Sequence, residues 1–168
     1  DSLGASLPGV ISIDSHCNQQ DNAYFSPLAK RLCFGWHAAG AGKIVWAADD
    51  ADVVIHEAGH SVNHSLASTS ILNSSFEAGA IDESLSDYWA LTILNDAELS
   101  EWFLGAMGSS YIRDAKENHA YPSGLVAEIH DDCRILTELL WDLRSTSSLG
   151  KADTDRLVKK ALQLLPAT

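Results

Sequence analysis

Two histidines four residues apart, His56 and His60, stand in the five-residue sequence His-Glu-Ala-Gly-His. A helix is predicted there, because Asp49 or Asp50 can cap its start. Its apolar side would carry Val53, Val54, Ala58 and Val62. Residues four apart in a helix lie about 6 Å along the axis on nearly the same face, so two imidazoles can bind one metal ion at roughly 2.1 Å. Glu57 projects from the flank, where its carboxylate can reach a water on the metal. An ordinary helix with two surface or core histidines is the alternative.

A catalytic metal site that keeps a position for water needs a third protein ligand from elsewhere in the chain. His64 continues the series, but eight residues along a helix span about 12 Å, too far for all three histidines to meet at one ion. A histidine at position 66, the metzincin spacing, is absent. Glu83 is the better candidate, since a second helix is predicted at about 79–94. One turn further on, Asp87 can accept the outer N–H of a metal-bound imidazole. An acidic, solvated helix face is the alternative.

The sequence pattern of apolar residues changes at about residue 48. Before it, short β-branched or aromatic runs at 10–13, 23–25 and 43–46 are interrupted by Gly, Pro, Asn and Asp, which indicates strands and loops. After it, apolar residues recur at helical spacing. Strands followed by a run of helices predict an α+β fold. We expect one compact domain over 1–168, with a small antiparallel β region at about 1–48 and a mainly helical part at about 49–168.

Further helices are predicted in the second part of the chain. One short helix is expected at about 100–107, and a longer one follows the irregular segment 111–124. A last helix, capped by Asp153 or Thr154, would stop at Pro166. Its buried side would carry Leu157, Val158, Ala161, Leu162 and Leu165. The helix that carries the two histidines would then lie between the β region and these helices.

Composition excludes several classes of partner. Eleven basic residues against 23 acidic ones give a formal charge of −12, whereas nucleic acid and anionic lipid require a basic surface. No apolar run reaches the roughly 18 residues of a membrane span. The three cysteines Cys17, Cys33 and Cys133 permit one disulfide at most, and the sequence leaves the pairing open. The first ten residues lack the features of a signal peptide, so an exported protein would be a processed form or an excised domain.

Several segments resemble a known family in order and spacing: 52–54 before the paired histidines, Gly-Ala-Ile-Asp-Glu-Ser-Leu-Ser-Asp at 79–87, and 101–105. They are similar to segments of the gluzincin metallopeptidases, specifically the thermolysin family and the related fungalysins. The resemblance covers about residues 20–145 in patches. It implies a zincin-like fold and a zinc-dependent endopeptidase with one catalytic Zn²⁺. His56, His60 and Glu83 would be the ligands, and Glu57 the general base.

The resemblance also assigns roles to residues around the metal. Asp87 and Asp82 would orient the two zinc histidines. Asn22 and Ala23 resemble the family's edge strand, which pairs with an extended peptide substrate; an ordinary turn and strand is the alternative. His130 resembles the histidine that donates to the oxyanion in the transition state. A capping or buried histidine is the alternative for that position.

Arg113 resembles, more weakly, the arginine that binds the substrate carbonyl beside the scissile bond; a solvated loop arginine is the alternative. The chain also departs from the family. Ser74 stands where thermolysins have a tyrosine, and Leu125 where an aspartate precedes the transition-state histidine, although Glu128 can support His130 instead. Asp52 is the main remnant of the calcium-binding cluster, so calcium is only a weakly supported second ion. The chain is unusually short for this family.

These features predict a peptide or protein substrate and, by resemblance, a secreted monomer whose other partners are a prosegment or a protein inhibitor. One competing hypothesis is a zinc-binding inactive homologue that serves as a binding module. Retention of Glu57 argues against it, because a purely structural zinc site needs no base. Zinc-dependent hydrolysis of a bond other than a peptide bond is a further alternative.

Overall fold

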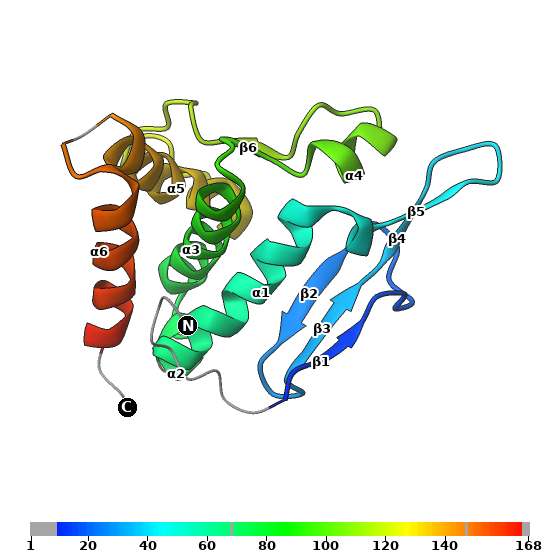
Figure 1. The fold of residues 1–168 in the computed structure, drawn as a ribbon, viewed down its shortest axis with the longest axis horizontal. Coiled ribbons are helices and arrows are strands. Elements are labelled where there is room, and N and C mark those ends of the chain that lie inside the picture. The colour runs from blue at the N-terminus through cyan, green and yellow to red at the C-terminus, as the bar shows by residue number, and fades with distance from the viewer. Residues whose placement is uncertain (1–9, 68, 147, 166–168) are drawn as a thin grey trace.

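The computed structural model describes residues 10–67, 69–146 and 148–165. Five short strands precede the first long helix: β1 (Ser12–Asp14), β2 (Ala23–Ser26), β3 (Arg31–Phe34), β4 (Trp36–Ala38) and β5 (Ile44–Trp46). Three of them correspond to the runs expected at 10–13, 23–25 and 43–46. β4 and β5 form an antiparallel hairpin that extends away from the rest of the molecule (Figure 1).

The other three strands form a sheet in the order β1–β3–β2. β2 and β3 are antiparallel, but β1 pairs with β3 in parallel, so the expectation of a wholly antiparallel β region is wrong. The physical reason is that the loop 15–22 reverses the chain between β1 and β2, so β1 runs antiparallel to β2 and parallel to β3, which lies between them. The loop 15–22 therefore crosses the end of β3, where Cys17 is disulfide-bonded to Cys33. β2 is an edge strand of this sheet.

Six α-helices follow, with two short strands among them. The helices are α1 (Ala51–Leu66), α2 (Thr69–Leu72), α3 (Phe76–Leu94), α4 (Glu101–Ala106), α5 (Ile129–Ser145) and α6 (Gly150–Leu164), and the strands β6 (Glu98–Leu99) and β7 (Arg113–Asp114) pair with each other. As expected, Asp50 caps α1 by accepting from two backbone N–H groups of its first turn. None of these helices is both long enough and apolar enough to cross a membrane.

The last helix starts earlier than expected. α6 begins at Gly150, so the predicted cap at Asp153 or Thr154 is wrong. Thr154 is instead buried inside the helix, and its hydroxyl donates to the Gly150 carbonyl. The buried side of α6 consists of Thr154, Val158 and Leu162, whereas Leu157 is 50% exposed. The helical spacing of the apolar residues therefore predicted the helix itself, but it assigned too many residues to the buried side.

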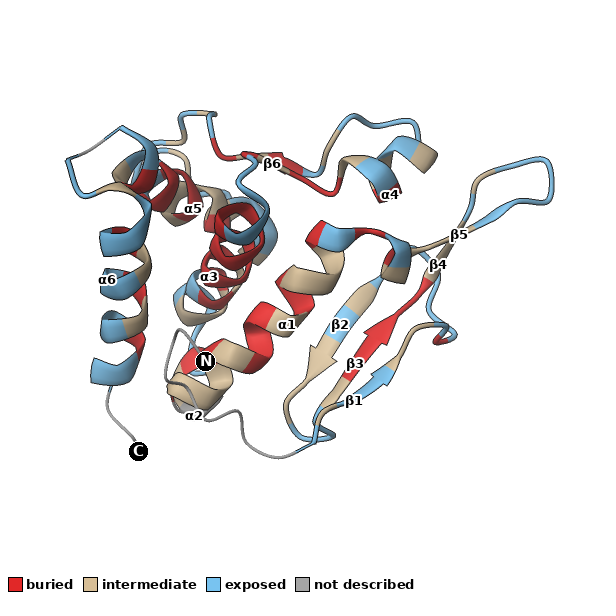
Figure 2. Cartoon of the chain, in the orientation of Figure 1, coloured by how far each residue is buried: buried red, intermediate tan, exposed pale blue. Residues whose placement is uncertain are grey.

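α1 lies between the three-stranded sheet and the helices α3 and α6, as expected for the helix with the paired histidines (Figure 1), and it contributes to two hydrophobic cores. Its residues Val53, Val54 and Ala58 pack with Leu32, Phe34 and Phe103 on the sheet side. Its residues Ile55, Val62 and Leu66 pack with Leu85, Tyr88 and Trp89 of α3, and with α5 and α6. α3 and β3 are the most buried elements of the two sides (Figure 2). The apolar residues of α1 are thus divided between two faces.

Candidate metal centre

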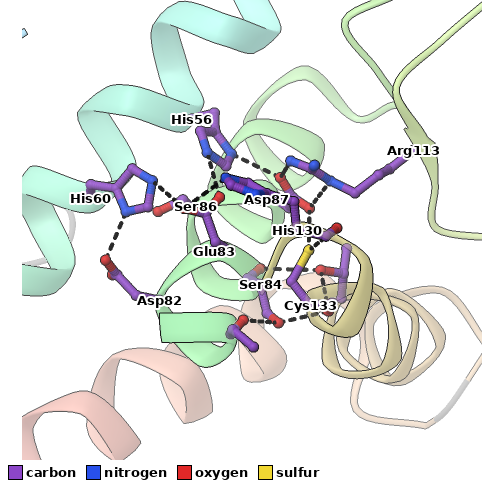
Figure 3. Close-up of polar contacts among 12 residues, drawn as sticks. His56, His60, Asp82, Glu83, Ser84, Ser86, Asp87, Arg113, His130 and Cys133 are labelled. Atoms are coloured by element: carbon purple, nitrogen blue, oxygen red, sulfur yellow. Dashed lines mark hydrogen bonds and ion pairs between the residues drawn. The ribbon is translucent and has the colours of Figure 1, made fainter. Parts of the chain in front are cut away.

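The imidazoles of His56 and His60 converge on the carboxylate of Glu83 (Figure 3). α1 supplies both histidines one helical turn apart, and α3 supplies the glutamate. The two helices approach closely because Gly59 faces α3, where a Cβ would lie 3.0 Å from the Cα of Ser86. His56 Nε2 lies 3.2 Å from Glu83 Oε2, and His60 Nε2 lies 3.4 Å from Oε1.

This arrangement fits a tetrahedral divalent ion. Ligand atoms about 2.1 Å from a zinc ion at tetrahedral angles lie about 3.4 Å from each other. The two nitrogen-to-oxygen distances, 3.2 and 3.4 Å, match that separation. In addition, Glu83 Oε2 is a buried oxygen without a hydrogen-bond partner. Since buried polar atoms are almost always satisfied, this orphaned acceptor is suited to a cation.

A second carboxylate lies behind each histidine, as the sequence resemblance implied. His56 Nδ1 lies 2.8 Å from Asp87 Oδ1, and His60 Nδ1 lies 2.8 Å from Asp82 Oδ2. A carboxylate that accepts from Nδ1 fixes the tautomer in which Nε2 is the free electron-pair donor. Both Nε2 atoms face Glu83, so the outer contacts orient the two rings for one shared ion.

The electrostatics of the site favour positive charge. Burial opposes protonation of His56, but the nearby carboxylates of Asp87 and Glu83 outweigh it and raise the pKa of the imidazole to about 10. Burial likewise acts to raise the pKa of Asp82, but the hydrogen bonds with His60 and His64 hold it well below its usual range. Either a proton on His56 or a bound divalent cation would balance the negative charge of the buried carboxylates.

Glu57 is buried between the sheet side and the two histidines. Its side chain faces the same cavity as His56 and His60. Burial raises the pKa of Glu57, while the charges of the two imidazoles act to lower it. A carboxylate whose affinity for a proton is raised in this way is better able to accept one from water.

The cavity beside these residues has a volume of about 550 Å³. One wall is the edge strand β2 with the residue before it, so that both Asn22 and Ala23 line the cavity. On one side, Ala23 pairs with Phe34 of β3. The opposite wall is largely apolar, with Leu99, Phe103, Leu104, Met107 and Ile112. A cavity with one β edge and one apolar wall can hold an extended chain.

His130 lines the cavity from the first turn of α5. Its Nε2 atom lies 3.7 Å from Glu83 Oε1. Its side chain is 55% exposed, so the alternative of a buried histidine does not hold. Glu128 caps α5, and its Oε1 atom lies 2.9 Å from His130 Nδ1, which is the contact expected if Glu128 supports His130. The contact directs Nε2 of His130 toward the cavity side.

Arg113 lies in β7 and is buried, so the alternative of a solvated loop arginine does not hold. Its Nε and Nη2 atoms each donate to a carboxylate oxygen of Asp87 over 2.7 Å. Arg113 also lines the cavity, which is compatible with the substrate contact that the resemblance implied. The bidentate pair with Asp87 gives it a second, positioning role that the sequence did not indicate.

Sequence reasoning missed one functional residue, Asn63. It is fully buried, and its Nδ2 atom donates to Asp82 Oδ1 over 2.8 Å. Its position three residues after His60 on α1, facing α3, was the available signal. Ser74, at the tyrosine position, donates to the Ile71 carbonyl and is not among the residues of the cavity wall, where the structure places Asn73 instead.

Asp52, the residue that the resemblance linked to calcium, is buried in the first turn of α1. Burial, with the neighbouring Asp50 and Glu101 carboxylates, raises the pKa of Asp52 to about 7. Asp50 itself is engaged by α1 and by Ser100 and the Phe103 N–H. Elsewhere, Glu117, His119 and Glu138 also lie within reach of one ion. Arg134 donates to Glu117, and the ring of His119 contacts Glu138.

A scan against models of known protein families and a search of curated protein sequences each found no match to this chain. The features of the chain that bear on function are therefore the residues of the site, above all the two nitrogen-to-oxygen distances at Glu83 and the two carboxylates behind the histidines.

Proposed function

We propose that this chain is a zinc-dependent metalloendopeptidase of the gluzincin type with a zincin-like fold. The observation that carries the proposal is the convergence of His56, His60 and Glu83 beside the buried Glu57 in one cavity. Three protein ligands leave a tetrahedral ion one position for water, as in catalytic rather than structural zinc sites. Zn²⁺ is the only cofactor that the proposal needs; calcium is not required.

Bound zinc would polarise the scissile carbonyl and make water more acidic. Glu57 would take the proton from the attacking water and then deliver it to the leaving amine. Its buried position keeps bulk water away from the carboxylate, and its raised pKa suits both halves of this task. Asp87 and Asp82 would hold His56 and His60 in the orientation that binds the ion.

The cavity walls supply the remaining parts of the mechanism. His130 would donate from Nε2 to the oxyanion, a contribution of a few kcal/mol in comparable sites. Arg113 would bind the carbonyl next to the scissile bond while it remains paired with Asp87. Asn22 and Ala23 would bind the backbone of an extended substrate by strand addition to β2. A peptide or protein in extended form is the substrate that this edge favours.

A zinc-binding homologue without turnover, acting as a binding module, is the second candidate. The lack of the family's tyrosine at Ser74 favours it. The buried Glu57 speaks against it, because an isolated buried carboxylate costs stability and serves no purpose in a structural zinc site. We therefore keep the peptidase as the proposed function and the binding module as an outcome of the test.

We further propose that the protein acts outside the cell. The disulfide between Cys17 and Cys33 supports this, because such bonds persist in oxidising compartments. The remaining cysteine, Cys133, is buried. Secretion would also bring the protein to the protein substrates that the cavity favours, with a prosegment or inhibitor as further partners and the monomer as the active form.

The test is cleavage of casein by the wild type and by Glu57→Gln, with the zinc content of each measured by metal analysis. We expect both proteins to bind one zinc per chain and only the wild type to cleave, with activity reduced by at least about 10²-fold in the variant. If both bind zinc and neither cleaves, the binding module is the better description. If the wild type binds no zinc, both candidates are wrong.

A further inference from the structure

The carboxylate of Asp82 is held by three residues of α1. His60, Asn63 and His64 occupy one face of the helix, because they are three and four residues apart. Asp82 Oδ2 lies 2.8 Å from His60 Nδ1 and 3.1 Å from His64 Nε2. Asp82 Oδ1 accepts from Asn63 Nδ2 over 2.8 Å. One buried carboxylate from α3 thus receives three donors from a single helix face.

The orientation of these donors is fixed from outside the site. Asn63 Oδ1 accepts from Trp89 Nε1 over 2.8 Å, so its amide nitrogen must point toward Asp82. Oδ1 of Asp82 is therefore committed to Asn63, and Oδ2 is left to the two histidines. An ionised carboxylate can only accept hydrogen bonds. His64 must therefore donate from Nε2 to the same Oδ2 atom that accepts from His60 Nδ1.

The two candidate zinc histidines are supported in matching ways. Behind His56 stands Asp87, which Arg113 holds through two hydrogen bonds of 2.7 Å. Behind His60 stands Asp82, and His64 occupies the place that corresponds to Arg113. In both cases a donor that is not a zinc ligand keeps an aspartate in the position where it can orient a ligand. Without His64, the carboxylate of Asp82 loses one of its three side-chain donors, and Oδ2 keeps only the contact with His60 Nδ1.

We propose that His64 is a positioning residue for the metal site, which acts through Asp82 on the orientation of His60. The inference rests on the proposed zinc site and goes beyond it, since His64 is too far along α1 to be a ligand. The spacing of the histidines excludes His64 as a metal ligand, but His64 can still affect the site through Asp82. His64 also lines the cavity, but its role here lies in the bond to Asp82.

The test measures the zinc dissociation constant by competition with a chromophoric chelator. Removing a residue that contacts a ligand directly weakens metal binding by roughly 10- to 100-fold, so we expect that range for Asp82→Ala. His64 acts one bond further away, and we expect about fivefold weaker binding for His64→Leu. His64→Gln, whose amide can donate to Asp82, should restore affinity to within about twofold of the wild type.

A control removes a histidine that belongs neither to the cavity wall nor to the residues that could hold a metal ion. His16 contacts Ser15 and the ring of Trp46, and His16→Leu should leave zinc affinity unchanged. The absorption spectrum of the cobalt-substituted protein gives a second readout: His64→Leu should shift the cobalt bands and His16→Leu should not. A purely structural role would lower stability without either change.

Two results would overturn the inference in distinguishable ways. If the wild type binds zinc and His64→Leu binds it equally well with an unchanged cobalt spectrum, the positioning role is wrong and the proposed function stands. If the wild type binds no zinc, the proposed function and the inference are both wrong. Failure of His64→Gln to restore affinity would show that the volume of the side chain, not its donor, matters.

Discussion

At the scale of single residues, Asp87 is the carboxylate on which most contacts of the site depend. It is fully buried in α3 and lies 2.8 Å from His56 Nδ1. Both of its oxygens accept from Arg113, and Cys133 Sγ lies 3.6 Å from one of them. Burial acts to raise the pKa of Asp87, but the charge of Arg113 and the contact with His56 keep it well below its usual range. The ion pair with Arg113 therefore keeps Asp87 ionised in the core, where burial alone would favour the protonated form.

We predict that Arg113→Ala lowers the free energy of unfolding of the zinc-free protein by about 3 kcal/mol, because it breaks a buried bidentate ion pair and leaves His56 as the charged partner of Asp87. Urea denaturation measures this loss. The matched control is Arg31→Ala, which breaks the ion pair with Asp14 at a site where both side chains are more than a third exposed, at 43% and 37%. A much smaller loss is expected there, because solvent screens an exposed ion pair. Similar losses in the two variants would contradict the role given to burial.

At the scale of elements, the site depends on how closely α1 and α3 pack. Gly59 stands between the two zinc-site histidines on α1. A Cβ at this position would lie 3.0 Å from Ser86 Cα, 3.2 Å from the Trp89 ring and 3.3 Å from the Ser86 carbonyl oxygen. Two of these neighbours are backbone atoms of α3, which cannot move without the helix. The absence of a side chain at Gly59 therefore determines how closely α1 and α3 approach. It also determines the distance between His60 and Glu83.

We predict that Gly59→Ala destabilises the protein. Helix propensity alone would gain about 1 kcal/mol, but overpacking at a helix contact costs about 1–3 kcal/mol, so the net loss is about 1 kcal/mol. Zinc affinity should fall as well, because α1 and α3 carry different ligands. The control is Gly79→Ala in α3, where the nearest atom to a new Cβ is 3.5 Å away. That variant should be as stable as the wild type or more so, and an equal loss in both would refute the packing argument.

Elements with a strong period were predictable from the sequence, and contacts between elements were not. α1 and its cap at Asp50 follow from local rules. The relation of His56 to His60 follows too, because helical geometry fixes it. By contrast, β3 was not predicted, since its four residues depend on pairing with β1 and β2 for their structure. The parallel pairing of β1 likewise depends on which strand edge it meets in the folded chain, and a local sequence pattern does not encode that.

The same distinction holds inside the candidate site. Glu83 and its neighbours could be named from spacing and family resemblance, because they lie on one helix face. The bonds of Arg113 to Asp87 and of His64 to Asp82 join elements far apart in the chain. Periodicity gives the side of a helix on which a residue lies, but not the partner it meets there. Those bonds therefore had to come from the structure.

At the scale of the whole molecule, the candidate metal site lies where the two cores meet. α1 packs on the sheet side through one face and on α3 through another, so the two cores share an element. The candidate ligands belong to α1 and α3, and Glu57 projects toward the sheet. Unfolding of either side would disturb α1, so we expect one cooperative transition rather than two. A ligand bound at this junction should stabilise the entire chain.

We predict that removing zinc with a chelator lowers the melting temperature of the whole protein in a single transition. At a free zinc concentration 100 times the dissociation constant, binding to the folded state contributes about 2.7 kcal/mol. For a chain of this size, that corresponds to a shift of about 5–10 °C, measurable by circular dichroism. Glu83→Gln, which lacks a ligand, should lose most of the shift. Glu57→Gln should retain it, because a base that binds no metal leaves the ligand set intact. Loss of the shift in Glu57→Gln, or its retention in Glu83→Gln, would mean that the roles of the two carboxylates are assigned the wrong way round.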